Sequence, residues 1–347
     1  MTRKKQKDQE SEYDFKELFP KISYTQLKKH KTDPKNHIAG NGFLKRGAAC
    51  ILTGGTGIGK SVLAEQIAVY ISTGLPVFGK IPIKKAAKVL YLEAENDEEV
   101  LKQDFVSIGR EIGVDEKLLE KNLDIRYVPG LPEKHFEQFM LDMLEDSKPD
   151  LIVVDPYQSF IGSVDLNSTE PFFKWRNLMD NLISKEMYNC ALLLICHTTK
   201  PTDRKDWSDA EYAYMAMGTS AISNWTRTAC ELLHIKGEHG KYRLHFSKSP
   251  ARTGMVDELG GIVRELFIEH SGDINSPYWK TSERETKVVV ADIKDLVLRA
   301  HEADLDMSLS QIALKYRIGK ATVSRHAKAL KEEGKWEDPK KKKKKKK

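Results

Sequence analysis

The segment GGTGIGKS at Gly54–Ser61 decides the fold that the sequence predicts. It matches G-x-x-x-x-G-K-[ST] and lies between an apolar run at 49–53 and a stretch of helical periodicity at 62–71. Glycines let backbone N–H groups curl around a phosphate, whose charge the helix N-terminus favours. The lysine reaches the β- and γ-phosphates, and the serine hydroxyl ligates Mg²⁺. The predicted site for ATP and Mg²⁺ consists of Gly54, Gly55, Thr56, Gly57, Ile58, Gly59, Lys60, Ser61 and Val62.

Short apolar runs alternate with helical segments around this loop. The five main runs lie at 49–53, 88–92, 123–128, 151–155 and 191–197. Such runs, separated by helices, are typical of parallel strands that are covered on both faces. Later runs at 232–235, 242–247 and 266–269 are expected to close the sheet as antiparallel strands. The predicted fold class is therefore α/β with a mostly parallel central sheet.

Polar side chains end three of the runs. Asp155 closes LIVVD, where a carboxylate can hold Mg²⁺ through water, so Ser61 and Asp155 are the predicted metal ligands. Glu93 and Glu95 follow KVLYL. Either is a candidate general base that orients the attacking water, and the alternative is a pair of solvated loop acids. His197 closes ALLLICH and is either a γ-phosphate sensor or a strand-end histidine bound to local backbone.

The charge balance excludes a globally basic protein. The 347 residues include 57 Lys plus Arg and 51 Asp plus Glu, for a formal net charge of +6. The last eight residues, Lys340–Lys347, are all lysine, and without them the net charge is −2. A nucleic-acid site must therefore be a local basic patch. The tail is either a polycation that raises DNA affinity or a solvated end without a specific role, and it cannot confer base specificity.

Cysteines and apolar runs suggest the compartment. The four cysteines form no C-x-x-C pair, which argues against zinc or a disulfide framework and fits a reduced cytosol. Residues 1–10 are charged and lack the apolar region of a signal peptide. The aliphatic run at 191–196 is too short to span a bilayer. A cytoplasmic protein with no membrane partner is expected.

The order of motifs resembles a known family. The phosphate loop is followed by YLEAEN at 91–96, LIVVDP at 151–156, LLICHTTK at 193–200 and GTSAISNWTRT at 218–228. This order is similar to that of the RecA-like ATPases of the RepA hexameric helicase family of plasmid and phage replication, as is TGLPVFGKIPI at 73–83. The resemblance covers about residues 43–268. It implies a RecA-like P-loop core that assembles into a homo-oligomer, expected to be a hexameric ring.

The resemblance also implies catalytic roles for residues beside Lys60. Glu95 matches the family's catalytic glutamate, which favours it over Glu93. Asp155 matches the magnesium-site aspartate, and His197 matches the sensor histidine. The family often has a second polar residue before that histidine, whereas this sequence has Cys196.

One catalytic role belongs to the neighbouring subunit's site. Arg227, in NWTRT, matches the arginine finger of the family. A guanidinium supplied in trans stabilises charge on the transferring phosphoryl group. Lys248 and Arg252 are weaker candidates for contacts of this kind. Without the resemblance, the sequence favours interpreting Arg227 as a surface helix residue.

The family resemblance places DNA-binding loops after the strands that end at Asp155 and His197. The second loop, 198–217, offers Lys200, Arg204 and Lys205 close to aromatic residues, which suits single-stranded DNA. An ordinary long solvated loop is the alternative. The first loop, 158–173, has no Lys or Arg.

The C-terminal segment 308–334 resembles the helix-turn-helix superfamily. A serine, Ser308 or Ser310, can cap a first helix, Gly319 makes a turn, and residues 322–331 form the recognition helix. Between 315 and 331 there are cations and no acid, the footprint expected of phosphate contact. A protein-docking helical hairpin is the alternative. The predicted duplex contacts are Lys320, Thr322, Ser324, Arg325 and Lys328.

These patterns divide the chain into five segments. They are a polar, mostly irregular arm at 1–37, a RecA-like ATPase domain at 38–270, a linker at 271–286, a small all-α (winged) helix-turn-helix domain at 287–339, and the lysine tail at 340–347. The function expected is an ATP-hydrolysing DNA helicase or translocase in plasmid or phage replication. A DNA-binding ATPase regulator that does not unwind, or a RecA-like recombination ATPase, is the alternative.

Overall fold

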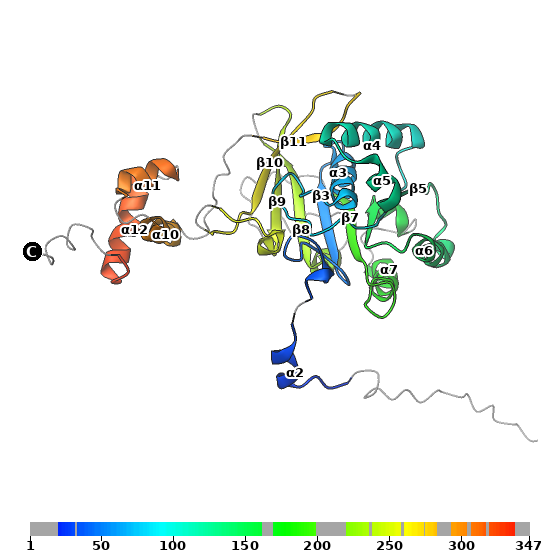
Figure 1. Ribbon diagram of the computed structural model, residues 1–347, viewed down its shortest axis with the longest axis horizontal. Coiled ribbons are helices and arrows are strands. Elements are labelled where there is room, and N and C mark those ends of the chain that lie inside the picture. The colour runs from blue at the N-terminus through cyan, green and yellow to red at the C-terminus, as the bar shows by residue number, and fades with distance from the viewer. Residues whose placement is uncertain are drawn as a thin grey trace, which may run out of the picture. The chain divides into compact units, whose positions relative to one another are not determined.

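The computed structural model describes most of the chain (Figure 1). The described residues are 20–31, 33–161, 169–198, 220–235, 238–257, 260–273, 275–282, 293–303, 307–316 and 319–336. They belong to two compact units, Met1–Lys35 and Asn36–Lys347.

The described part of the N-terminal unit contains a short helix, α2 (Tyr24–Lys29). Ser23 caps it by accepting from the backbone N–H of Gln26, and the Gln26 side chain accepts from the N–H of Ser23. This reciprocal capping box satisfies two donors that a helix start leaves free. The prediction of a mostly irregular arm missed this S-x-x-Q signal.

The second unit is built on a nine-stranded sheet, in the order β11-β10-β9-β8-β3-β7-β6-β4-β5. Strands from β8 to β5 in this order are parallel, and β9, β10 and β11 extend the β8 side as antiparallel neighbours. The strands are β3 (Ala49–Gly54), β4 (Val89–Glu93), β5 (Leu123–Tyr127), β6 (Leu151–Asp155), β7 (Ala191–His197), β8 (Thr228–His234), β9 (Lys241–Lys248), β10 (Glu265–His270) and β11 (Trp279–Thr281). The predicted α/β class with a mostly parallel sheet is confirmed.

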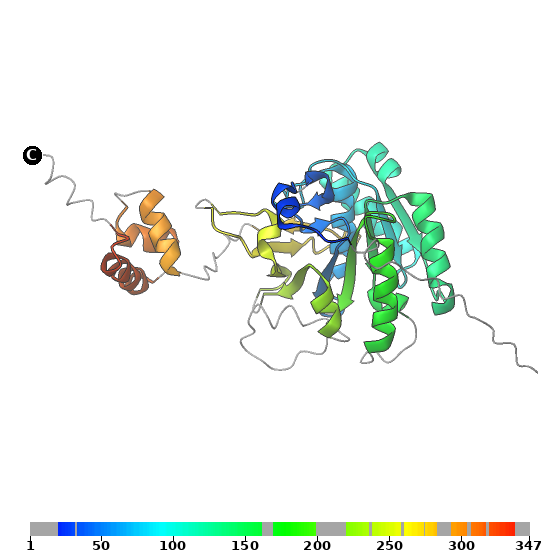
Figure 2. The same ribbon diagram turned by 90° about the horizontal axis from the view of Figure 1, so that it is seen from below.

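Helices cover both faces of this sheet (Figure 2). One face carries α3 (Lys60–Thr73), α4 (Glu98–Ile112) and α5 (Glu116–Asn122), and the other carries α6 (Glu133–Ser147) and α7 (Thr169–Leu182). Successive strand residues alternate between the faces. Tyr91 and Val153 therefore pack with α3 and α4, whereas Leu92 and Val154 pack with α6 and α7.

Shorter elements join these layers. A two-stranded sheet, β1 (His37–Ala39) with β2 (Leu44–Lys45), precedes β3. The single-turn helices are η1 (Pro34–Asn36), η2 (Tyr157–Phe160) and η3 (Pro250–Thr253), and α9 (Ser220–Trp225) precedes β8. In the described residues, no helix is long and apolar enough to cross a membrane.

One expectation about the sheet is confirmed and another differs from the structure. The run at 232–235 lies at the end of β8, where Leu232, Leu233 and His234 pair antiparallel with β9 as expected, while β8 also pairs in parallel with β3 on its other side. The segment 271–286 contains β11, so the sheet continues beyond the predicted domain end at 270. The segment 271–286 is polar in composition, but it includes one strand residue, Trp279, whose side chain is fully buried.

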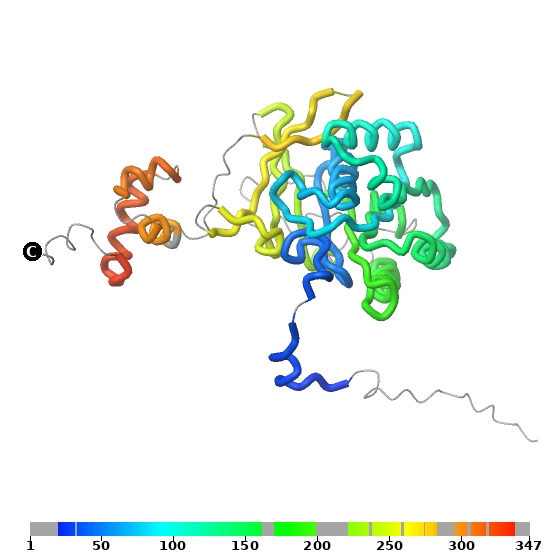
Figure 3. The backbone as a smooth tube through the Cα atoms, viewed as in Figure 1, coloured from blue at the N-terminus to red at the C-terminus, as the bar shows by residue number. Residues whose placement is uncertain are grey.

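The C-terminal module has three helices, coloured orange to red in Figure 3. They are α10 (Ile293–Ala303), α11 (Leu309–Lys315) and α12 (Lys320–Glu332). Val297, Ile312 and Val323 meet in one apolar core, with one residue from each helix. Ser308 caps α11 through a capping box with Gln311. No strand occurs among 293–303, 307–316 and 319–336, so the expected wing is not found there.

Candidate nucleotide-binding site

The phosphate loop joins β3 to α3. Gly57 (φ 73°) and Gly59 (φ 86°) adopt left-handed backbone conformations that favour glycine. Between them the chain turns back so that α3 starts at Lys60, with its N-terminus at the loop. Backbone N–H groups at such a turn and helix start form an anion-binding cradle. The strand–loop–helix context predicted for GGTGIGKS is therefore present.

Lys60 begins α3 among other polar groups. Its Nζ atom donates to the carbonyl oxygen of Gly55 at 2.7 Å and lies 3.3 Å from Nδ1 of His197. Burial lowers the pKa of the Lys60 ammonium, and the negative charges of Asp155 and Glu95 oppose this shift. These carboxylates favour the charged form of Lys60 at the anion-binding loop.

The carboxyl ends of the parallel strands bring the other predicted residues to the same edge of the sheet. Gly54 pairs with His197 across β3 and β7, and Glu93 pairs with Asp155 across β4 and β6. In parallel α/β sheets, ligands bind outside these strand ends. The structure thus gathers the loop, His197, Asp155 and the two glutamates from segments far apart in the sequence.

Asp155 is a buried acid of the site, with 2% of the residue exposed. The Tyr91 hydroxyl donates to its Oδ2 atom at 2.6 Å, and Ser61 is also hydrogen-bonded to its side chain. Burial raises the pKa of Asp155 to about 6, although hydrogen bonds from Tyr91 and Ser61 and the charge of Lys60 lower it. Sequence reasoning missed Tyr91, whose only signal was its place two residues before Glu93.

The oxygen atoms available here suit Mg²⁺. Ser61 and Asp155 supply a hydroxyl and a carboxylate, the hard ligands that Mg²⁺ takes together with phosphate oxygens and water. The Oε2 atom of buried Glu93 has no hydrogen-bond partner in the described residues. Burial and the neighbouring carboxylates raise the pKa of Glu65 on α3 well above its usual range. A divalent cation would lower the cost of keeping such acids ionised, so the residues fit the metal.

Glu93 and Glu95 have different environments. Glu93 is 1% exposed, and its Oε1 atom accepts the backbone N–H groups of Glu95 (2.8 Å) and Asn96 (2.9 Å). Burial and the charge of Asp155 raise its pKa to about 8. The Glu95 side chain is 56% exposed, and its Oε2 atom lies 4.0 Å from Nε2 of His197. The open position of Glu95 suits contact with a substrate, whereas Glu93 binds the turn.

His197 lies between Lys60 and Glu95. An ammonium can only donate, so Nδ1 of His197 accepts from Lys60 and Nε2 carries the hydrogen, on the side of Glu95. Burial lowers the pKa of His197, Lys60 lowers it further, and Glu95 opposes the shift. The imidazole is therefore neutral at pH 7. Cys196 precedes His197. Burial raises the pKa of the Cys196 thiol, so this side chain is neutral.

Trp279 of β11 backs the phosphate loop, a contact that sequence reasoning missed. Its Nε1–H donates to the carbonyl oxygen of Gly59 at 3.2 Å, and its ring would lie 2.8 Å from a Cβ atom added at Gly59. The Gln66 side chain of α3 binds both the N–H and the carbonyl of Trp279 at 2.7 Å. The segment that follows the ATPase core is thus attached to the loop and to its helix.

Arg227 lies at the end of the sheet that is opposite to the phosphate loop. Its backbone N–H donates to the carbonyl of Ala49, the first residue of β3, whereas the phosphate loop follows the last. The residue is exposed, and within the described residues its side chain forms no ion pair. Burial, Arg227 and Arg252 lower the pKa of Lys248, so these three cations are neighbours.

The predicted DNA contacts divide into two groups. Lys200, Arg204 and Lys205 lie outside the described residues. In the C-terminal module, Thr322 is half-buried, and the other four predicted contacts on α12 are exposed: Lys320, Ser324, Arg325 and Lys328.

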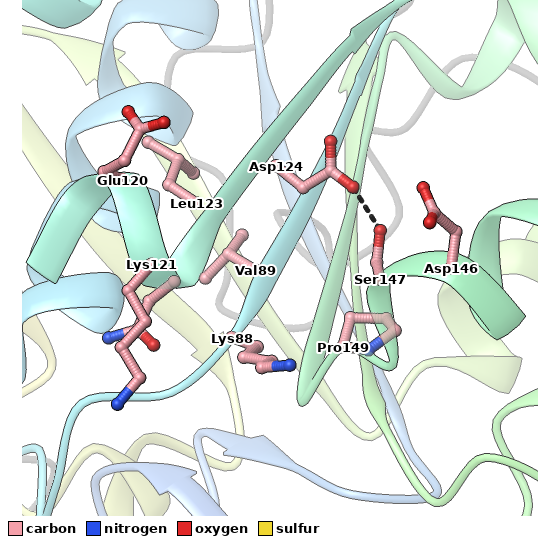
Figure 4. Close-up of a pocket in the computed structure, with 10 residues that line it drawn as sticks. Lys88, Val89, Glu120, Lys121, Leu123, Asp124, Asp146, Ser147 and Pro149 are labelled. Carbon is pink, nitrogen blue, oxygen red and sulfur yellow. Dashed lines mark hydrogen bonds between the residues drawn. The ribbon is translucent and has the colours of Figure 1, made fainter.

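A cavity of about 350 Å³ lies away from the loop, where β4, β5 and β6 begin (Figure 4). Acidic residues and lysines line this cavity, and the Ser147 hydroxyl donates to Asp124 across it. Arg126 also pairs with Asp124. Because several of its charged and polar groups satisfy one another and it is at the amino ends of the strands, it is not the nucleotide site.

Comparison with known proteins agrees with this geometry. Residues 16–203, more than half of the chain, match the AAA domain family. The chain belongs to this family. It is also similar to circadian clock protein KaiC2 of Synechocystis sp., with 28% identity over 235 residues. The alignment covers 67% of this AAA protein and 36% of KaiC2, so the chain corresponds to little more than a third of that relative. Family, fold and loop together support a RecA-like P-loop ATPase.

Proposed function

We propose that this AAA protein is an ATP-dependent DNA helicase or translocase of the RepA type, which acts in plasmid or phage DNA replication. ATP is hydrolysed at the subunit interfaces of a hexameric ring, and hydrolysis moves single-stranded DNA through it. The observation that carries the proposal is the placement of Arg227 at the sheet edge opposite its own phosphate loop. A catalytic arginine at that position acts only on a neighbouring subunit, so the active unit is an assembly.

Within each site, the residues have separate tasks. Lys60 neutralises charge on the β- and γ-phosphates, and Ser61 and Asp155 hold Mg²⁺. The metal supplies charge stabilisation to the phosphoryl group. Glu95 orients the attacking water, and His197 donates its Nε2–H towards the γ-phosphate end of the site.

The C-terminal module supports a DNA partner. Three exposed cations of α12, Lys320, Arg325 and Lys328, extend over more than two helical turns. The opposite side of the helix is buried in the three-helix core. A recognition helix needs this division, with phosphate-contacting cations outside and an apolar face inside. The module therefore recruits duplex DNA or places the ring on it.

A forked duplex with a single-stranded tail tests the proposal. Wild-type protein with ATP and Mg²⁺ is expected to displace the labelled strand, with hydrolysis stimulated by single-stranded DNA. Lys60→Ala should do neither, because the phosphates lose their main cation. Stimulated hydrolysis without displacement would rule out the helicase, and strand exchange on a continuous filament would favour a recombination ATPase.

Replacing Lys320, Arg325 and Lys328 together with Ala is expected to weaken duplex binding and leave basal ATP hydrolysis intact. Because the triple variant lacks three cations that bind phosphates, the slope of log affinity against log salt should fall by about three. Fluorescence anisotropy across a salt series measures this slope. Lys335→Ala, which removes an exposed cation just after α12, is the matched control. An unchanged slope in the triple variant would show that α12 is not the phosphate-contacting helix.

A second candidate is a DNA-binding ATPase regulator that does not unwind. The observation that favours it is the similarity to KaiC2, which is described as a circadian clock protein. The fork assay separates this candidate from the helicase.

A further inference from the structure

Glu93 holds the turn that carries the proposed catalytic glutamate. The turn consists of Ala94, Glu95 and Asn96 and lies between the end of β4 and Asp97, the N-cap of α4. Two of its three backbone N–H groups, those of Glu95 and Asn96, donate to one atom, Oε1 of Glu93. The third N–H, of Ala94, donates to the carbonyl oxygen of Asp155. Every backbone N–H group of the turn is therefore accounted for.

Other contacts hold the two ends of the turn without the Glu93 side chain. On the far side, Asp97 accepts the N–H groups of Glu99 and Val100, so α4 is capped independently of Glu93. On the near side, the Glu93 carbonyl accepts from Val128, which fixes the end of β4. Between these two fixed points, the backbone at Glu95 is held by the Glu93 carboxyl group.

We propose that Glu93 is a positioning residue for ATP hydrolysis, which acts by accepting the N–H groups of Glu95 and Asn96 and so fixes the Glu95 carboxylate towards the reacting phosphate. This inference rests on the proposed role of Glu95 as the group that orients water. Glu93 itself does not contact the substrate. Its Oε1 atom is occupied by the turn, and the residue is buried, whereas Glu95 extends into the open site.

Two substitutions separate positioning from acid–base chemistry. Glu93→Gln keeps an oxygen at the same distance from the backbone, so it can accept both N–H groups, but it cannot ionise. Glu93→Asp keeps a carboxyl group but is one methylene shorter, so it withdraws the acceptor from the turn. A positioning role predicts that Gln is the better replacement, and a chemical role predicts that Asp is.

Steady-state hydrolysis and amide hydrogen exchange provide the test. Glu93→Gln is expected to keep kcat within about threefold of wild type, because the acceptor remains. Glu93→Asp should lower kcat by about 10- to 100-fold with little change in KM, since Glu95 is misplaced while the phosphate loop is intact. Exchange at Glu95 and Asn96 should accelerate in Glu93→Asp alone. The reverse order of kcat would overturn the proposal, as would unchanged exchange in Glu93→Asp.

Thermal unfolding and binding of an ATP analogue establish that each variant is folded. If Glu93→Asp fails to fold, Glu93→Met replaces it, because Met has a similar length and no oxygen acceptor. The exchange measurement does not depend on turnover. A wild-type protein without hydrolysis would therefore refute the proposed ATPase activity, while the inference about the turn would still be decided by the exchange rates.

Discussion

Glu95→Gln is expected to slow ATP hydrolysis by about 10²- to 10⁴-fold, the usual contribution of a positioned acid–base group. The side chain is half-exposed at the loop edge of the sheet, and its Oε2 atom lies 4.0 Å from His197. The substitution removes the negative charge that polarises water and keeps the shape of the side chain. Nucleotide affinity should change little, because Lys60, Ser61 and the loop N–H groups are untouched.

Single-turnover hydrolysis and equilibrium binding of ATP with Mg²⁺ measure the two effects separately. Glu99→Gln is the matched control, since Glu99 is an exposed acid in the first turn of α4. It should behave as wild type. If Glu95→Gln retained wild-type kcat while Glu93→Gln was inactive, the base would be the buried glutamate, and the two assignments would have to be exchanged.

Local sequence signals were sufficient for the central sheet and the phosphate loop. Each of the five main apolar runs became a parallel strand, with ends within one residue of the predicted ones. A strand that is buried on both faces needs only consecutive apolar residues, so its signal lies in a few neighbouring positions. The loop is equally local, because its glycines, Lys60 and Ser61 are adjacent in the chain. The convergence of Asp155 and His197 then follows from parallel topology.

Contacts between distant segments were not predictable in this way. Trp279 binds Gln66 and Gly59 across more than 200 positions of the chain. The residues around Trp279 are polar, so the segment has the composition of a linker. One buried tryptophan changes the average polarity of such a segment very little. Similarly, the parallel pairing of β8 with β3 is a property of sheet order, and the composition of a strand does not determine its partner. The role proposed for Glu93 could not be predicted for a third reason. It depends on which backbone N–H groups donate to its carboxyl oxygen.

Arg227→Ala is expected to reduce ATP turnover by about 10³- to 10⁵-fold, as for an arginine finger. Distance prevents Arg227 from acting within its own subunit. The Arg227 N–H binds Ala49, and the loop follows Gly54 at the other end of six-residue β3. At about 3.3 Å per residue, these ends are about 16 Å apart, farther than an arginine side chain extends. Arg110→Ala, which removes another exposed arginine, is the control and should retain activity.

Mixing inactive variants tests the trans assignment directly. Lys60→Ala subunits keep Arg227 but lack a working loop, and Arg227→Ala subunits have the opposite defect. In a random one-to-one mixed ring, about a quarter of the interfaces join an intact loop to an intact arginine, because each subunit contributes one half to each of two heterologous contacts. Turnover should therefore reappear on mixing, although each variant alone is inactive. Confirmed mixed assembly without any recovery would contradict the arginine finger. It would also remove the main support for a ring, because the cation cluster of Arg227, Lys248 and Arg252 would then have no role in a neighbouring nucleotide site.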